Sequence, residues 1–163
     1  MDVKAVVENR SEALSRLDAF VGEWELEVRF PPGHPAAATV TDDAKARSRF
    51  EWALNGQFLL QHTEITIPEA PDSLTIISVD PNTGAYTQHY YDTRGVVRVY
   101  AMEFAAGVWT LLRETPDFSP LDFRQRFAGT FSDDGRVISG AWEIGSDGAD
   151  WELDFDLIYR RAG

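Results

Sequence analysis

The chain has 163 residues, of which 44% are hydrophobic and 12% aromatic, and its formal net charge is −12 at pH 7. This length fits one domain, and the share of apolar residues is enough to build a core, so the composition excludes a disordered chain. The negative charge would repel nucleic-acid phosphates and anionic lipid surfaces, so we expect neither as a partner. The sequence contains no cysteine, which excludes disulfides, thiolate metal ligands and thiol nucleophiles.

The first twenty residues predict a short helical segment. Charged side chains interrupt the apolar ones, so the segment lacks the continuous apolar run of a signal peptide, and no stretch of the chain is long enough to span a membrane. Leu14, Leu17 and Phe20 recur near helical spacing, and Ser11 is suited to cap a second short helix. We therefore expect one or two helices and a cytoplasmic location.

From Gly22 the apolar residues follow the period of a strand. Trp24, Leu26 and Val28 alternate with glutamates, which is typical of a half-buried strand. The proline-rich residues 31–35 cannot continue a hydrogen-bonded ladder. We expect them, with the alanines that follow, to form a loop or lid near one mouth of the fold.

Strands and tight turns alternate through the rest of the chain. Asn55-Gly56, residues 80–84 and residues 132–135 supply the Asn, Pro, Asp and Gly that hairpin turns need. The periodicity predicts further strands over residues 50–54, 58–67, 73–79, 86–91, 96–104, 108–114, 121–131, 137–144 and 151–160.

Turns this short leave no room for the crossovers that parallel strands need. Closure of the sheet also removes edge strands that would otherwise promote aggregation. We therefore predict an all-β fold, a closed antiparallel up-and-down β-barrel of about ten strands. It forms a single domain over residues 1–163, with a helical segment over 1–20 and the barrel over 22–161.

The segment LDAFVGEW, residues 17–24, resembles the helix and Gly-x-Trp motif that open lipocalin-like barrels. Three further motifs extend the resemblance over residues 17–161: the Asn55-Gly56 hairpin, the turn at 80–84, and Tyr91-Asp92 followed by Gly95. On these motifs the chain resembles a bacterial lipocalin-like domain of unknown function in the calycin superfamily, related to the nitrobindin-type barrels.

The resemblance implies structural roles for a few residues. In such barrels the first-strand tryptophan closes one end, and a basic residue near the end of the last strand packs across it as a cation over an indole face. Gly22 and Trp24 match the first of these features, and Arg160 or Arg161 matches the second.

Nitrobindin-type proteins hold haem iron through a histidine in the C-terminal part of the barrel and begin with a glycine-rich strand. This chain differs in both respects, because its last histidine is His89 and its first strand carries Glu25 and Glu27. The three histidines also lack the spacing of a metal site, and His34 lies in the proline-rich loop. We expect no cofactor and no metal, and keep a nitrobindin-like haem protein as a less favoured alternative.

The barrel interior is the natural ligand site. If the apolar alternation marks the inside, the wall or core consists of Trp24, Leu26, Val28, Trp52, Leu54, Phe155 and Leu157. The polar candidates share strand faces in pairs, and an inward arginine would hold an anionic head group. The candidate ligand-binding residues are His62 with Glu64, His89 with Tyr91, Arg98 with Tyr100, and Trp52.

For some strands the sequence does not decide which face points inward, because a register shift of one residue exchanges the two faces. Over 86–91, either His89 with Tyr91 or the opposite set of Tyr86, Gln88, Tyr90 and Asp92 faces the cavity. Strand histidines more often make cross-strand or surface contacts than catalytic ones.

We predict a barrel that binds one small, mostly apolar ligand. The main alternative is a cofactor-free isomerase, cyclase or hydrolase with His89 or His62 as base and Tyr91 or Arg98 as stabiliser. A third hypothesis is an interaction module whose acidic surface binds a basic partner. We also consider a homodimer that forms through an exposed strand face.

Overall fold

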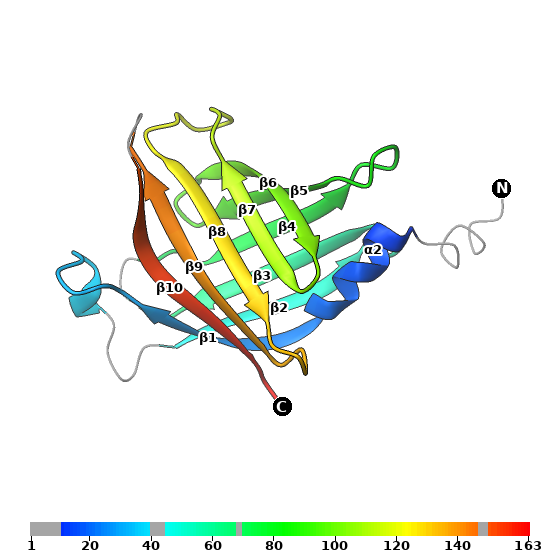
Figure 1. Cartoon of the computed structure of the whole chain (residues 1–163), viewed down its shortest axis with the longest axis horizontal. Helices are drawn as coiled ribbons and strands as arrows, with labels where there is room; N and C mark the ends of the chain where they lie inside the picture. Colours follow the sequence, from blue (N-terminus) through cyan, green and yellow to red (C-terminus); the bar gives the residue numbers. More distant parts are fainter. Residues whose placement is uncertain (1–10, 40–44, 68–69, 147–149) are drawn as a thin grey trace.

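The computed structural model describes residues 11–39, 45–67, 70–146 and 150–163 (Figure 1). In these residues a short helix, α2 (Glu12–Arg16), and a 3-10 turn, η1 (Leu17–Phe20), precede the sheet, and a second 3-10 turn, η2 (Ala37–Thr39), follows the first strand. The strands are β1 (Gly22–Arg29), β2 (Ala46–Ala53), β3 (Phe58–Ile65), β4 (Ser73–Val79), β5 (Tyr86–Asp92), β6 (Val97–Ala105), β7 (Val108–Arg113), β8 (Arg124–Phe131), β9 (Val137–Gly145) and β10 (Trp151–Arg161).

Every strand pairs antiparallel with its neighbours in the chain, and β1 also pairs with β10, so the sheet closes. This confirms the predicted up-and-down barrel. Ser11 caps α2 as predicted, since its hydroxyl accepts a hydrogen bond from the backbone N–H of Leu14 at 3.2 Å. The earlier helix predicted within residues 1–10 lies outside the described residues.

The two ends of the barrel differ. The turns β2–β3, β4–β5, β6–β7 and β8–β9 gather at the end where α2 lies, and the other connections gather at the opposite end (Figure 1). At the α2 end the Tyr86 hydroxyl donates to the backbone carbonyl of Ala13 at 2.6 Å. The helical segment therefore covers one end, which we call the closed end.

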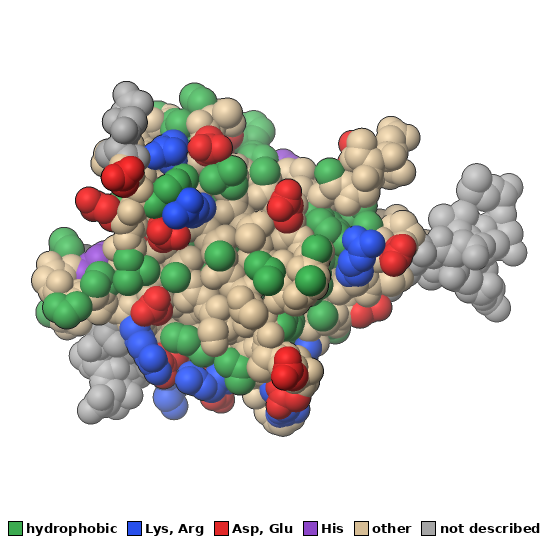
Figure 2. Space-filling view, in the orientation of Figure 1, with side chains coloured by type: hydrophobic (Ala, Val, Ile, Leu, Met, Phe, Trp, Pro, Cys, Tyr) green, Lys and Arg blue, Asp and Glu red, His purple; other side chains and the backbone are tan. Residues whose placement is uncertain are grey.

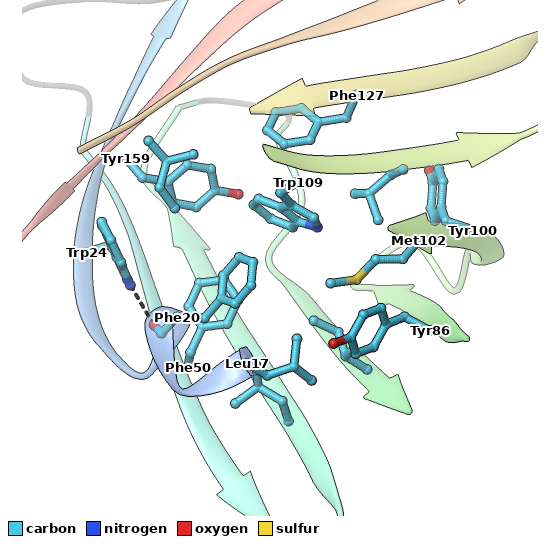
Figure 3. Packing of buried hydrophobic residues seen from close by; sticks show 14 of the residues in the cluster. Leu17, Phe20, Trp24, Phe50, Tyr86, Tyr100, Met102, Trp109, Phe127 and Tyr159 are labelled. Carbon is cyan, nitrogen blue, oxygen red and sulfur yellow. Dashed lines mark hydrogen bonds between the residues drawn. The ribbon is translucent and has the colours of Figure 1, made fainter. Parts of the chain in front are cut away.

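Aromatic side chains fill the closed end, as Figure 3 shows. Phe20 lies at the centre, with ring centroids 4.9 Å from Phe104 and Trp109, 5.1 Å from Phe131 and 5.3 Å from Phe50. Tilted and edge-on contacts of this kind suit the aromatic quadrupole, and burial of one such ring contributes about 1.5–3 kcal/mol. We call this set of five rings the aromatic plug.

Trp24 on the first strand and Arg161 on the last strand both hold η1 in place. The indole N–H of Trp24 donates to the Phe20 carbonyl at 2.8 Å, and the Arg161 guanidinium stacks 4.2 Å from the indole ring. Arg161 also donates to the backbone carbonyls of Ala19, Val21 and, at 3.1 Å, Gly135. The guanidinium therefore satisfies carbonyls that the 3-10 turn leaves free.

Gly22 has a φ of 127°, and a Cβ there would lie 2.9 Å from the Arg161 guanidinium, which explains a glycine at this position. Arg160 points to the other face of β10, where it lies 3.4 Å from Glu27. The partner of Trp24 is therefore Arg161 and not Arg160. The strand period of two decides between the adjacent arginines.

The surface in Figure 2 carries acidic and basic side chains of both signs, with hydrophobic side chains scattered between them. None of the helices in the described part of the chain is long and apolar enough to cross a membrane.

We expect Arg161→Ala to lower the free energy of unfolding by about 2–3 kcal/mol, because it removes three hydrogen bonds from a charged donor and the stacking on Trp24. Urea unfolding followed by tryptophan fluorescence measures this. Arg160→Ala is the matched control and should cost less than about 1 kcal/mol, because its ion pair is exposed. Equal losses in the two variants would contradict the role given to Arg161.

Candidate ligand-binding cavity

A cavity of about 770 Å³ occupies the barrel between the aromatic plug and the opposite end. Pro35 and Ala36 of the loop after β1, Ala70 and Pro71 of the β3–β4 connection, and Arg94 of the β5–β6 turn border it there. We call this end the mouth. The proline-rich loop therefore lies near one mouth, as the sequence predicts.

The cavity has two chemically different walls. Strands β3 to β6 contribute mainly polar side chains: Gln61, Thr63, Ser73, Thr75, Gln88, Tyr90, Arg98 and Tyr100. Strands β1 and β7 to β10 contribute mainly apolar ones: Leu26, Val28, Trp109, Leu111, Phe127, Trp142, Ile144, Phe155 and Leu157. We call these the polar wall and the apolar wall.

A hydrogen-bond network organises the part of the polar wall nearest the plug. Gln61 donates through its amide nitrogen to Ser48 at 2.8 Å and to the Tyr159 hydroxyl at 3.3 Å, and its carbonyl accepts from Thr75 at 3.1 Å. Ser48 and Thr63 share a further hydrogen bond of 2.6 Å. Burial raises the pKa of Tyr159 to about 12, so this phenol stays protonated at neutral pH.

Nearer the mouth, Arg98 and Tyr100 face the cavity from β6. The Tyr100 hydroxyl donates to the carbonyl of Gln125 at 3.0 Å. Burial raises the pKa of Tyr100, and the adjacent Arg98 opposes this shift. The Arg98 guanidinium lies 5.9 Å from the centroid of the Phe123 ring.

Three buried polar atoms of the cavity lining have no hydrogen-bond partner among the described residues: Nε of Arg98, Nε1 of Trp109 and Oε1 of Gln88. Figure 3 shows the indole nitrogen of Trp109 on the ring edge that faces Met102. Buried polar atoms are almost always paired in folded proteins. These two donors and one acceptor lack an intramolecular partner, and neighbouring atoms enclose each of them.

Tyr90, Asp92 and Arg94 form a fixed cluster at the mouth. Arg94 donates to one Asp92 oxygen through Nε and Nη2 at 3.1 and 2.6 Å, and the Tyr90 hydroxyl donates to the same oxygen at 2.8 Å. Burial would raise the pKa of Asp92, but the hydrogen bonds from Arg94 and Tyr90 outweigh it and lower that pKa to about 2. Burial and the Asp92 carboxylate raise the pKa of Tyr90.

A buried ion pair fixes the β7–β8 loop beside the mouth. Arg113, only 3% exposed, donates to the two carboxylate oxygens of Asp117 at 2.9 and 3.0 Å, and Asp117 also accepts from the N–H groups of Val99 and Ser119. Arg113 further donates to the carbonyls of Ser119 and Pro120, both at 3.2 Å. These hydrogen bonds, chiefly those from Arg113, lower the pKa of Asp117.

The apolar wall is fixed by two glycines. Gly129 and Gly140 are paired across β8 and β9, and a Cβ on Gly140 would lie 2.5 Å from the Phe127 ring. The missing side chains let the ring lie against the backbone, where it stacks on Trp109 and Trp142 with centroids 4.9 and 5.2 Å away. The aromatic rings thereby line the wall without filling the cavity.

The structure separates the predicted site residues into two groups. Arg98 and Tyr100 lie together on the polar wall. His62 and Glu64 face outward on β3, where His62 lies 3.1 Å from Glu51. His89 and Tyr91 do not line the cavity either, because the opposite face of β5, with Gln88 and Tyr90, points inward.

Two predicted wall residues lie away from the cavity. Trp52 lies at the closed end, where its indole N–H donates to Asp18 at 2.9 Å. Leu54 is 74% exposed and has a φ of 49° in the β2–β3 turn, so the predicted inward position of this residue is wrong. Leu26, Val28, Phe155 and Leu157 line the cavity, and Trp24 is buried beside the plug.

Several cavity residues were not among the predicted binding residues, chiefly Gln61, Thr75 and Gln125. Polar residues inside a barrel break the rule that apolar positions mark the core. On β3 both faces carry apolar side chains, Phe58 and Leu60 with His62 and Leu59 and Ile65 with Gln61, so hydrophobicity alone does not decide the inward face. The cross-strand pairing of Gln61 with Thr75 would have been the useful signal.

None of the three histidines lines the cavity. His34 lies at the mouth, where its Nε2 is 2.9 Å from Asp154 and its Nδ1 accepts from the N–H of Ala36. No group of three histidine, aspartate or glutamate residues within the described ranges is arranged to hold a metal ion. The lining residues therefore do not fit a haem ligated by histidine.

No protein-family model matches the chain, and no curated protein matches it. Among solved structures, the crystal structure of Rv2717c from M. tuberculosis is similar, with a TM-score of 0.61 and 12% sequence identity. The similarity covers 94% of this chain and 99% of that chain. At this identity the comparison shows a shared fold.

We expect Asp117→Asn to lower the free energy of unfolding by about 3 kcal/mol, because it leaves the Arg113 charge buried without a counter-charge. The pKa of Asp117 is lower in the folded chain than in the unfolded one, so its contribution is present above about pH 4 and is lost as the pH falls further. Urea unfolding at pH 7 and pH 3 measures both effects.

The variant should therefore lose less stability than the parent protein between pH 7 and pH 3. Asp122→Asn, an exposed change in the same loop, is the control and should alter stability at pH 7 by about 0.5 kcal/mol or less. A similar small effect from Asp117→Asn would contradict the importance of the buried pair.

Proposed function

We propose that this protein binds one small, mostly apolar molecule inside its barrel. The observation that carries the proposal is a cavity of about 770 Å³ whose lining contains unpartnered buried atoms on Gln88, Arg98 and Trp109. A concave, mainly apolar space with a few polar groups is typical of small-molecule sites, and this volume lies within their usual range. The polar wall, with Arg98 and Tyr100, would meet polar substituents of such a ligand.

The arrangement of the interior supports binding over simple core packing. The rings around Phe20 concentrate at the closed end, and Phe127 is held against Gly129 and Gly140. Both features keep large side chains out of the space near the mouth. The fixed clusters at Asp92 and Asp117 border this space with ordered loops.

The lining supports a binding role more than a catalytic one. An acid–base enzyme needs a group that exchanges a proton near neutral pH, and His62 and His89 do not line the cavity. The lining phenols of Tyr90, Tyr100 and Tyr159 all have a raised pKa, chiefly through burial, which makes them poor bases at pH 7.

We also infer that the chain is one of the lipocalin-like bacterial domains of the calycin superfamily. The opening segment at residues 17–24 supports this inference, because Trp24 closes one end of the barrel under a basic residue of the last strand. The barrel shared with Rv2717c from M. tuberculosis is consistent with it.

The first test uses the neutral probe N-phenyl-1-naphthylamine, whose fluorescence rises on transfer to an apolar site. We expect saturable binding of one probe per chain, and Leu111→Trp should weaken it at least about tenfold, because an inward indole occupies the cavity. Titration by fluorescence measures the affinity, and native mass spectrometry of the purified chain shows any ligand that copurifies.

Leu112→Trp is the matched control. The two leucines are adjacent on β7, but Leu111 is 2% exposed and faces the cavity while Leu112 is 36% exposed. Val28→Trp, at a half-buried lining position, provides a second blocking variant if Leu111→Trp is unstable. Absence of binding, or equal binding by the Leu111→Trp and Leu112→Trp variants when both are folded, would overturn the proposal.

A further inference from the structure

We propose that the ligand is a small aromatic acid, a flat ring system with one anionic group that Arg98 holds. This inference rests on the proposed function and adds the chemical class of the ligand. It follows from the charge state of the polar wall and from the composition of the wall opposite.

Arg98 differs from the other basic residues of this region in having no carboxylate partner. Arg94 at the mouth is paired with Asp92, and Arg113 behind the wall is paired with Asp117. Within the described ranges Arg98 forms no ion pair, and its Nε atom is buried without a hydrogen-bond partner. The Arg98 side chain is half-buried in the cavity lining, and an anionic ligand would offset the cost of partly desolvating its charge without a counter-charge.

The neighbours of Arg98 leave it as the dominant charge inside the cavity. Across β5 and β6 it is paired with Tyr90, and the next inward pair is Gln88 with Tyr100. All three neighbours are neutral, because the pKa of both phenols is raised. The carboxylate of the described lining, Asp154, lies on β10 and contacts His34.

The chain as a whole carries a net charge of −12, which repels anions. Selective binding of an anion therefore requires a local cationic site shielded from the surface charges. The half-buried guanidinium of Arg98 in the cavity lining supplies such a site, because low dielectric strengthens a charge-assisted hydrogen bond.

The apolar wall favours a flat aromatic skeleton over an aliphatic chain. Phe127, Trp142 and Phe155 line it, and Trp142 packs edge-on against Tyr100 with ring centroids 5.6 Å apart. Ring faces arranged in this way stack on a planar ligand. Polar residues of the opposite wall, among them Gln61, Thr75 and Tyr100, would meet polar substituents on the ring system.

The test compares two probes with one skeleton. 1-Anilinonaphthalene-8-sulfonate carries an anionic sulfonate that N-phenyl-1-naphthylamine lacks, so the ratio of their affinities isolates the contribution of the charge. We expect the protein to prefer the sulfonate, and Arg98→Gln to reduce this preference at least about tenfold. Isothermal titration measures both affinities.

Two variants make the result specific. Arg126→Gln is the charge-matched control, because Arg126 faces outward and pairs with Glu143 at 3.0 Å, so the ratio should stay unchanged. Arg98→Lys keeps the charge without the guanidinium and should retain part of the preference. Thermal unfolding confirms that each variant is folded.

The outcomes separate this inference from the proposed function. If the neutral probe binds and Leu111→Trp blocks it, but Arg98→Gln leaves the preference unchanged, the barrel binds a ligand and the anionic class is wrong. If the preference falls equally in Arg126→Gln, surface charge explains it and the inference is overturned. If Leu111→Trp blocks neither probe, the cavity is not the site and both proposals fail.

Discussion

The number of strands is the constraint on which the rest of this structure depends. A barrel of about eight strands is just filled by its own side chains, whereas ten strands enclose more space than a simple core can occupy. The chain fills one end with the rings around Phe20 and covers that end with α2 and η1. The space that these rings leave unfilled is the cavity. Because the aromatic plug closes one end of the barrel, the cavity opens only at the mouth.

Two charged contacts hold the two ends in shape. At the closed end the Arg161 guanidinium stacks on Trp24 and binds backbone carbonyls of the turn that carries Phe20. Near the mouth Arg113 and Asp117 form a buried pair that orders the β7–β8 loop. In both places arginine serves because its planar group donates several hydrogen bonds at once. Arg98 has the same donors but no carboxylate partner among the described residues, which is why it stands out as a binding group.

The candidate site was harder to predict than the fold because its residues break the pattern that revealed the strands. Apolar alternation identified Leu26, Val28 and Leu157 as lining residues correctly. It failed on β3 and β5, where Gln61 and Gln88 face inward and histidines face outward. A strand fixes only that alternate residues share a face, so polar residues on both faces leave the direction undetermined.

The sequence by itself determined the strands, their turns and the closed antiparallel barrel, because these depend on local periodicity and turn chemistry. The role of Trp24 was implied by the resemblance to lipocalin-like barrels. Tertiary structure alone decided that Arg161 rather than Arg160 lies on the indole, since only closure of β1 on β10 brings these residues together. It also decided which face of each mixed strand is inward and left Arg98 without a counter-charge. Those outcomes depend on contacts between residues far apart in the chain, and the spacing of residue types carries no record of them.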